Sequence, residues 1–317
     1  MGKLYDGEWV EDEYESDEEG RFQREETVFR DWIRADGSGE YEPEAGRYHL
    51  YISRACPWAH RTAIMRRLKG LTDVVSMDIV DPYMGEDGWF FSGGEGSTPD
   101  TVHGSKYLRE VYLEADPNFT GRVTVPVLWD RETETIVNNE SAEIMRMFDV
   151  EFDEYADRDR TYYPEGKRDE VDRIIEAIYD PINNGVYRAG FAESQQAYEE
   201  AVTELFEALD HWESVLEEQR YLCGSEITEA DWCMFTTLYR FDAVYHTHFK
   251  CNVCRIVDYP NLWNYLKELY QYEDVAKTCN MDHCKEHYYT SHTDLNPKQI
   301  VPTGPMIDFE EPYDRSV

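Results

Sequence analysis

The sequence predicts an α/β domain followed by an all-helical domain. Two observations lead to this expectation: residues 47–71 have the pattern of a strand that runs into an amphipathic helix, and the patterned segments after residue 166 have helical spacing. In the first stretch, Tyr48, Leu50 and Ile52 alternate with their neighbours in the two-residue period of a strand with one buried face. A chain of 317 residues is long enough for two such domains, each with its own core.

The composition is strongly acidic, with 67 Asp and Glu residues against 31 Lys and Arg and a formal net charge of −36. Such a surface repels the phosphates of nucleic acids and anionic membranes, so we expect neither as a partner. An acid excess with scarce lysine is typical of proteins that work in concentrated salt, which predicts a halophilic source. The N-terminus lacks the basic start and apolar core of a secretory signal, and the seven cysteines then indicate reduced thiols in the cytoplasm.

Cys56 is the candidate nucleophile. It precedes Pro57, which suits the first position of a helix because its missing N–H would be unpaired there anyway. A cysteine at a helix N-terminus faces unsatisfied N–H groups and the positive end of the dipole, which favour thiolate over thiol. The residue three positions on is Ala59, so a mixed disulfide on Cys56 would wait for an external thiol. The alternative is an inert, buried cysteine.

A long loop is expected between a strand at residues 74–80 and a helix at residues 107–115. Residues 81–106 are rich in glycine, proline and aromatic residues, and a loop of this length inside a domain is usually functional or disordered. Trp89 and the two phenylalanines after it argue against disorder. We therefore expect this loop to lie near a ligand.

Pro126 interrupts a strand candidate at residues 123–130. Because proline cannot donate to a central ladder, it must lie at a strand start, an edge or a special turn. The Thr-Val-Pro-Val sequence here resembles the cis-proline turn of thioredoxin-like domains, in which the residue before proline, here Val125, offers its backbone to a peptide-like ligand.

Glu140 and Ser141 follow a short strand at residues 133–137 and precede a helix. Free N–H groups at a helix start, next to a carboxylate and a hydroxyl, suit the amino and carboxylate groups of a ligand. The alternative is that the two side chains only cap the helix. Further on, Thr228 and Asp231 have the spacing of a capping box, which predicts a well-defined helix start.

Eight runs carry a family resemblance: CPWAHR at 56–61, GRVTVPVLWD at 121–130, IVNNES at 136–141, INNGVYRAGFA at 182–192, ITEAD at 227–231, THFKCN at 247–252, DYPNLW at 258–263, and MDH with HYY within 281–289. As a set they resemble the glutathionyl-hydroquinone reductases, a branch of the glutathione transferase superfamily also called the Xi class. The resemblance implies a thioredoxin-like N-terminal domain followed by an all-helical glutathione-transferase C-terminal domain, in a homodimer. The residue patterns and the resemblance together predict an acidic arm laid on the surface at 1–45, the thioredoxin-like thiol-binding domain at 46–150, a linker at 151–166, the helical domain at 167–285 and a tail at 286–317 that packs near the active site.

The resemblance also implies a reaction. Cys56 would attack the sulfur of a thiol–hydroquinone conjugate, and a second thiol would regenerate the enzyme. Tyr187 and either Tyr288 or Tyr289 would donate hydrogen bonds to the ring oxygens, although with 24 tyrosines ordinary packing is the alternative reading. The residues implied at the small thiol are Trp89, Arg122, Val125, Pro126, Glu140 and Ser141. The thiol itself is glutathione or, in a halophile, γ-glutamylcysteine.

Two other functions stay open on the sequence: a transferase that conjugates thiols to electrophiles, and a non-catalytic thioredoxin-like binding protein. A transferase would activate its thiol with a Ser or Tyr hydroxyl, whereas Cys56 would trap it as a disulfide. Cys251 and Cys254 form a CxxC with histidines nearby, but one such pair without a second is a weak zinc signal, so we expect no metal.

Overall fold

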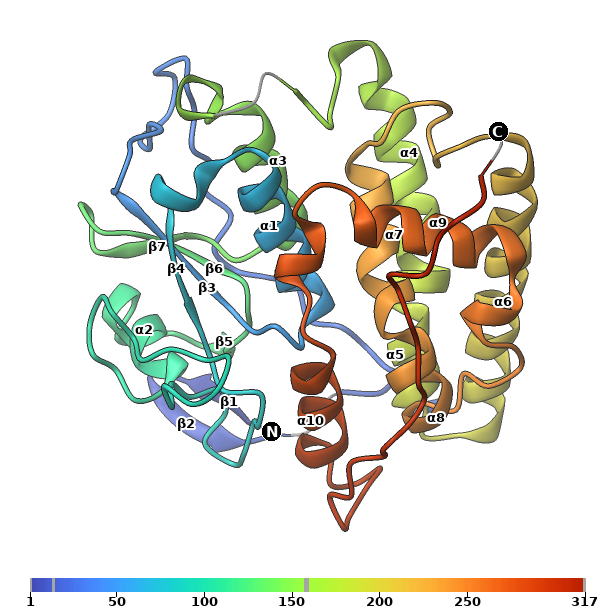
Figure 1. Ribbon diagram of the computed structural model, residues 1–317. Helices are drawn as coiled ribbons and strands as arrows, with labels where there is room; N and C mark the ends of the chain where they lie inside the picture. The colour runs from blue at the N-terminus through green and yellow to red at the C-terminus, as the bar shows by residue number, and fades with distance from the viewer. Residues whose placement is uncertain (1, 13–14, 157–159, 316–317) are drawn as a thin grey trace. The chain divides into compact units, whose positions relative to one another are not determined.

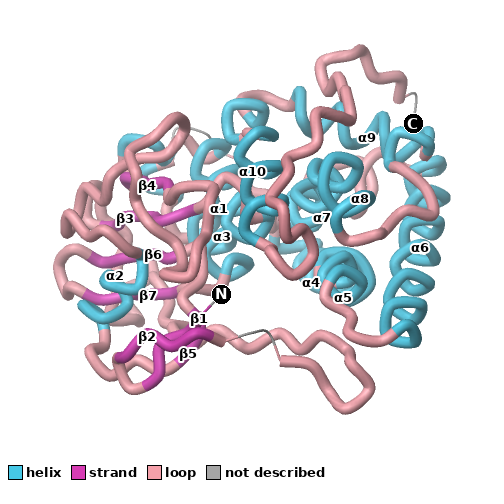
Figure 2. The backbone as a smooth tube through the Cα atoms, turned by 90° about the horizontal axis from the view of Figure 1, so that it is seen from below, coloured by secondary structure: helices cyan, strands magenta, loops and turns pink. Residues whose placement is uncertain are grey.

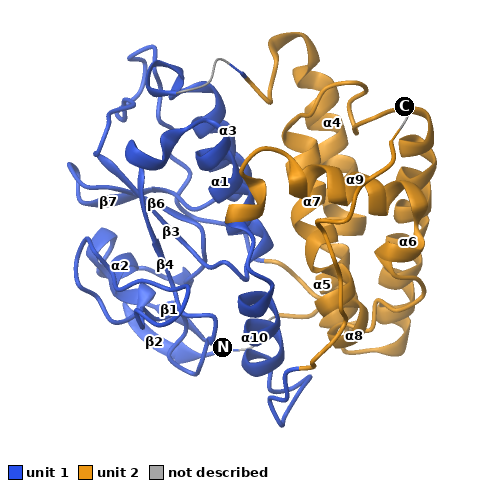
Figure 3. Ribbon diagram, in the orientation of Figure 1, with its two compact units in different colours: residues 1–13, 25–160, 278–301 blue, residues 14–24, 161–277, 302–317 orange. Residues whose placement is uncertain are grey.

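A computed structural model describes residues 2–12, 15–156 and 160–315. The chain divides into two compact units (Figure 3): residues 1–13, 25–160 and 278–301 form the first, and residues 14–24, 161–277 and 302–317 form the second. The boundaries of the two units differ from the expected domain boundaries. Residues 15–24 of the expected arm belong to the second unit, and residues 278–285 of the expected helical domain belong to the first unit. The expected arm, linker and tail each include residues outside the described part.

Among its described residues, the first unit contains two sheets and four α-helices. The strands are β1 (Gly2–Tyr5), β2 (Glu8–Glu11), β3 (Tyr48–Ile52), β4 (Ser76–Ile79), β5 (Gly121–Arg122), β6 (Val127–Asp130) and β7 (Thr135–Asn138), and the helices are α1 (Pro57–Leu68), α2 (Leu108–Ala115), α3 (Ser141–Val150) and α10 (Met281–Ser291). The central sheet has the order β4-β3-β6-β7, with β3 parallel to β4 and antiparallel to β6, and β6 antiparallel to β7. This mixed sheet with its helices has the thioredoxin-like architecture that the sequence predicts.

The strand β3 is buried on both faces, whereas its alternating pattern predicts one buried face. The reason is that the sheet is covered on both sides: α1 and α3 lie side by side on one face and α2 on the other (Figures 1 and 2). The polar residue His49 is accommodated in this interior because its Nδ1 lies 2.7 Å from Ser76 Oγ and its Nε2 lies 3.1 Å from Asp78 Oδ2.

The N-terminal residues form a hairpin, where the sequence predicts only an arm laid on the surface. Strands β1 and β2 pair in antiparallel fashion, and β1 also pairs with β5, so that Lys3 lies opposite Arg122. Leu4 and Ile33 are fully buried and anchor this part of the chain to the first unit.

The regular elements of the second unit are helices. They are α4 (Arg168–Ile178), α5 (Gly185–Gly190), α6 (Gln195–Glu218), α7 (Glu229–Arg240), α8 (His246–His248) and α9 (Pro260–Gln271), with π-helical turns at η4 (Tyr179–Asn183) and η5 (Phe241–Tyr245). The predicted capping box is present at the start of α7: the Asp231 carboxylate accepts the Thr228 N–H at 2.7 Å. Within the described residues, none of the helices has the length and apolar character that a membrane crossing needs.

Short 3₁₀ turns complete the described elements. They are η1 (Leu71–Asp73), η2 (Asp153–Tyr155), η3 (Glu165–Lys167), η6 (Ile256–Asp258) and η7 (Val275–Thr278).

Candidate active site

Cys56 is the N-cap residue of α1, and Pro57 is the first residue of the helix, as the sequence predicts. The Cys56 carbonyl accepts the His60 N–H at 3.0 Å, which closes the first helical turn. The side chain is partly exposed, and its Sγ lies 3.6 Å from the backbone carbonyl oxygen of Val125. The thiol therefore lies at the N-terminal end of a helix and directly beside the proline turn.

The Val125–Pro126 peptide bond is cis, and Pro126 lies directly before β6, so the expected cis-proline turn is present. A residue that the sequence analysis missed, Tyr112 of α2, holds this turn. Its hydroxyl donates to the Thr124 carbonyl at 2.9 Å and accepts the Thr124 N–H at 3.2 Å, and the Asn139 side-chain amide donates to it at 3.2 Å. Burial raises the pKa of the Tyr112 phenol, which keeps it protonated for this role. Tyr112 thus joins the proline turn to the turn before α3.

Glu140 is the N-cap residue of α3, and one carboxylate oxygen accepts the Ala142 N–H at 3.2 Å. Its other oxygen accepts the Thr27 hydroxyl at 3.3 Å, and the Ser141 hydroxyl lies 3.5 Å from the first. The capping role that the sequence left open is therefore present. Glu140 is nevertheless partly exposed.

Arg122 lies in β5, three residues before Val125, and is paired with two acids. Its Nη2 lies 2.8 Å from Asp12 Oδ2, and its Nε lies 3.0 Å from Glu25 Oε1. The resemblance implies that Arg122 lies at the small thiol, whereas in the structure its guanidinium is paired with these two protein carboxylates.

Trp89 lies in the long loop and stacks on His287 of α10, with ring centroids 4.7 Å apart and an interplanar angle of 23°. The loop and the helix are also joined by hydrogen bonds: His287 Nδ1 lies 2.9 Å from the Pro82 carbonyl, and His283 Nε2 lies 2.9 Å from the Glu95 carbonyl. These contacts explain why residues 278–301 belong to the first unit. The expected ligand-side loop is thus ordered against α10.

Two buried carboxylates hold the same loop on the sheet. Asp78 accepts the Thr101 N–H at 2.6 Å and Thr101 hydroxyl at 2.7 Å, and Asp100 accepts the Tyr51 hydroxyl at 3.0 Å. Burial raises the pKa of each carboxyl, but the hydrogen bonds outweigh it, so both pKa values lie below the ordinary value of 3.8. Both groups are therefore carboxylates at neutral pH, which keeps the loop position fixed.

Tyr288 and Tyr289 are both buried on α10. Tyr288 packs edge-on against His287, with ring centroids 5.1 Å apart, and His287 in turn stacks on Trp89. Tyr288, one of the two tyrosines that the sequence left as alternatives, therefore contacts the His287 ring that stacks on Trp89. No sequence pattern points to His287, because one histidine in a polar helix is unremarkable by itself.

Tyr187 lies in α5 of the second unit, in a cluster of aromatic rings. Its ring centroid is 5.5 Å from that of Phe249 and 6.0 Å from that of Tyr245. The guanidinium of Arg24 lies 4.8 Å from the Tyr187 centroid, and Arg24 Nε donates to Asn184 Oδ1 at 2.8 Å. Arg24 is a neighbour of Tyr187 that sequence reasoning missed, since 163 residues separate them in the chain.

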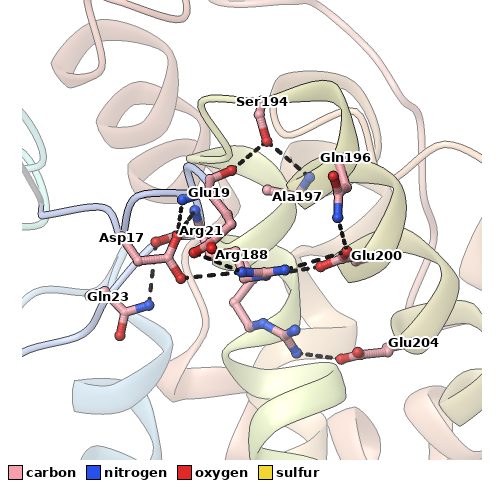
Figure 4. Close-up of polar contacts among 10 residues, drawn as sticks. All are labelled: Asp17, Glu19, Arg21, Gln23, Arg188, Ser194, Gln196, Ala197, Glu200 and Glu204. Carbon is pink, nitrogen blue, oxygen red and sulfur yellow. Dashed lines mark hydrogen bonds and ion pairs between the residues drawn. The ribbon is translucent and has the colours of Figure 1, made fainter.

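The segment that carries Arg24 is fastened to the start of α6 (Figure 4). Arg21 Nε lies 2.9 Å from Glu200 Oε2, in an ion pair drawn in the figure. The Ser194 hydroxyl donates to the Glu19 carbonyl at 2.7 Å and accepts the Ala197 N–H at 3.1 Å as the N-cap of α6. These contacts hold residues 15–24 on the helical unit.

Cys251 is buried and Cys254 is partly exposed. Within the described residues, no group of three or more His, Cys, Asp or Glu side chains is arranged to hold a metal ion. Burial raises the pKa of the Cys251 thiol, and burial followed by the charge of Asp258 raises that of Cys254.

Comparisons with known proteins agree with this geometry. Residues 55–151 match the family model described as glutathione S-transferase, N-terminal domain, and residues 195–268 match glutathione S-transferase, C-terminal domain. Glutathionyl-hydroquinone reductase YqjG of Escherichia coli is 49% identical, over 100% of this chain and 99% of that protein. The Xi class GST from Natrialba magadii has a TM-score of 0.95 at 59% identity, covering 99% of this chain and 96% of that one. The glutathione-bound structure of YqjG has a TM-score of 0.92 at 47% identity, covering 100% and 99%.

The chain belongs to the glutathione S-transferase superfamily and, within it, to the family of the glutathionyl-hydroquinone reductases, the Xi class. The resemblance and the fold class predicted from the sequence are therefore confirmed. The Natrialba magadii relative also fits the halophilic character that the acid excess predicts.

Proposed function

We propose that this protein is a cysteine-dependent reductase that removes a γ-glutamyl thiol from thiol–hydroquinone conjugates. The observation that carries the proposal is the position of Cys56, at the N-cap of α1 with its Sγ 3.6 Å from the Val125 carbonyl of the proline turn. A peptide-like thiol that pairs with the Val125 backbone brings its own sulfur to this cysteine. The curated relative that is 49% identical carries the name of this activity.

In the first step, the Cys56 thiolate attacks the sulfur of the conjugate. A sulfur–sulfur bond forms, the aryl carbon–sulfur bond breaks, and its electron pair goes to the ring, which takes up one proton and leaves as the hydroquinone. In the second step, an external thiolate attacks the mixed disulfide, which releases an oxidised disulfide and restores the Cys56 thiolate. In total, the external thiol and the sulfur of the conjugate become one disulfide, and one carbon–sulfur bond becomes a carbon–hydrogen bond.

Hydrogen-bond donors to the ring oxygens stabilise the charge that develops when the carbon–sulfur bond breaks. We assign this role to Tyr288, and the family resemblance implies it for Tyr187 as well. The Tyr288 assignment is supported by its packing against His287, the ring on which Trp89 stacks. Trp89 then provides an aromatic surface at the side of the bound thiol.

The thiol is held by its γ-glutamyl end in this proposal. Glu140 and the start of α3 take the amino and carboxylate groups, with Ser141 as a further hydrogen-bond partner, and Val125 and Pro126 receive the cysteine part. Both glutathione and γ-glutamylcysteine carry this end, and the acidic surface of the chain favours γ-glutamylcysteine as the thiol of a salt-adapted cytoplasm. We expect γ-glutamylcysteine to support turnover at least as well as glutathione. A strong preference for glutathione would contradict this choice of thiol.

We further propose that the enzyme acts as a homodimer, as the family resemblance implies.

The test is the variant Cys56→Ser, assayed by the release of hydroquinone from a thiol–hydroquinone conjugate. We expect the rate to fall by at least about a thousandfold, because a hydroxyl does not form the mixed disulfide. Cys254→Ser is the matched control, since Cys254 is also partly exposed, and it should retain the wild-type rate. Undiminished release by Cys56→Ser would refute the mechanism, and conjugation of thiols to electrophiles by wild type without reduction would instead favour a transferase.

A further inference from the structure

Ser76, His49 and Asp78 form a cluster in the central sheet that the proposed reductase reaction does not use. The Ser76 Oγ lies 2.7 Å from His49 Nδ1, and His49 Nε2 lies 3.1 Å from Asp78 Oδ2. The imidazole therefore lies between a hydroxyl and a carboxylate, as the base does in a serine nucleophile's catalytic triad. Such triads occur on unrelated folds and in different chain orders, so geometry and not sequence position identifies one.

The pairing of β3 with β4 determines this arrangement. The strands are parallel, with His49 opposite Ser76 and Tyr51 opposite Asp78. Ser76 and Asp78 are two residues apart in one strand, so their side chains lie on the same face of the sheet, beside His49. Strand β4 is at the edge of the sheet, and Ser76 is its first residue. The serine is partly exposed there, whereas His49 and Asp78 are buried, so a small substrate reaches the hydroxyl from solvent while the base stays covered.

Arg131, which follows β6, determines which nitrogen of His49 carries the proton. Its Nη2 lies 2.9 Å from Ser76 Oγ and 3.3 Å from His49 Nδ1. A guanidinium only donates hydrogen bonds, so Nδ1 beside it is the unprotonated nitrogen, and Nε2 carries the proton that faces Asp78. His49 Nδ1 is then the acceptor for the proton of the Ser76 hydroxyl.

The charges of the cluster suit a general base. Burial lowers the pKa of His49 and outweighs the opposing hydrogen bond and charge of Asp78, so the imidazole is neutral at neutral pH. Burial raises the pKa of the Asp78 carboxyl, but hydrogen bonds led by the one with His49 outweigh burial, so Asp78 is a carboxylate. This carboxylate stabilises the imidazolium that forms when His49 takes up a proton. The Arg131 guanidinium stabilises the negative charge that develops at the serine oxygen.

We propose that Ser76, His49 and Asp78 are a second catalytic site of this protein, which hydrolyses small carboxylic esters. His49 takes the proton of the Ser76 hydroxyl while the serine oxygen attacks the ester carbonyl carbon. The bond from this carbon to the alcohol oxygen then breaks, and the alcohol leaves with the proton from His49. Water attacks the acyl-serine with His49 again as the base, which releases the acid and restores Ser76. One water is consumed and no thiol is needed, so the reaction is independent of Cys56.

The test is the reaction of the whole protein with diisopropyl fluorophosphate, followed by mass spectrometry of the peptide that contains Ser76. The serine oxygen bonds to phosphorus, fluoride leaves and the proton goes to His49, so an activated serine is labelled. We expect one label at Ser76, and a labelling rate that falls at least about a hundredfold in His49→Gln because the base is lost. Ser92→Ala is the matched control: the hydroxyl of this exposed serine lies 2.9 Å from Ser97 Oγ instead of a histidine, and its removal should leave the rate unchanged.

Arg131→Gln guards against misfolding of the buried histidine variant, since Arg131 is exposed. It should slow the labelling of Ser76 at least about tenfold, because a donor to the serine oxygen is lost. Hydrolysis of p-nitrophenyl acetate is measured in Cys56→Ser protein, in which no Cys56 thiolate reacts with the ester, and should fall to the uncatalysed rate when Ser76→Ala is added.

Three results would overturn the inference: no label at Ser76 in the wild type, equal labelling rates in wild type and His49→Gln, or an unchanged rate in Arg131→Gln. Each would show that the cluster only holds the edge of the sheet.

Discussion

Replacing Tyr112 with phenylalanine tests whether one buried hydroxyl positions the proline turn. The change keeps the ring and removes the group that bonds the Thr124 carbonyl, the Thr124 N–H and the Asn139 amide at 2.9 to 3.2 Å. Tyr112 is fully buried, so these partners do not regain water easily. A buried polar group left without a partner costs about 1–3 kcal/mol, and with partial relaxation we expect a total loss of about 2–3 kcal/mol in the free energy of unfolding.

The assay pairs denaturant unfolding with thiol kinetics at one salt concentration. Because Tyr112 joins the Val125 and Glu140 turns, its loss should also raise the KM for the thiol, by about threefold to tenfold at nearly constant kcat. Tyr48→Phe is the control: its buried hydroxyl makes one bond, to the Glu42 carbonyl at 2.6 Å, so it should cost about 1 kcal/mol and leave KM unchanged. Equal stability losses in the two variants, with no change in KM, would refute the reasoning.

Three further predictions follow from the same structure. Tyr288→Phe should lower kcat for hydroquinone release by about tenfold to a hundredfold while Tyr289→Phe stays near wild type, and the reverse order would reassign the pocket tyrosine. Burial raises the pKa of the Asp130 carboxyl, but hydrogen bonds led by that from Arg47 outweigh burial, and the pKa in the folded protein lies below 3.8. The unfolded chain therefore binds more protons at this group, so the ionised Asp130 stabilises the folded protein, and this stabilisation is lost as the pH falls through the folded pKa. Asp130→Asn should therefore flatten the acid limb of Tm against pH, and an unaltered limb would contradict this. Thr228→Ala should lower the stability of the helical unit by about 1 kcal/mol in calorimetry through loss of the capping box, and an unchanged Tm would show that the box is dispensable.

Local patterns in the sequence predicted a large part of the fold and the main site. The helix start after Cys56, the proline at the start of β6 and the capping box at Thr228 each depend on neighbours within a few residues, so their chemistry is visible in the sequence. The strands expected at 74–80 and 133–137 lie within two residues of the observed ends of β4 and β7.

Features that depend on distant pairing were not predicted. The hairpin of β1 and β2 is too acidic to show a buried face, and its partner β5 lies more than a hundred residues away. The role of Tyr112 depends on two separate turns, and the ion pairs of Arg122 depend on Asp12 and Glu25 arriving from the N-terminal segment. Long-range contacts of this kind leave no periodic pattern, and only the folded chain brings them together.

The proposed mechanism requires that Cys56 takes the thiol from the conjugate as a mixed disulfide. This step is tested by mass spectrometry of the protein after one exposure to a γ-glutamylcysteine–hydroquinone conjugate, without free thiol. We expect one thiol adduct on the peptide that contains Cys56, reversed by dithiothreitol and matched by one equivalent of released hydroquinone. Release of hydroquinone with no adduct on Cys56, or with the adduct on another cysteine, would contradict it.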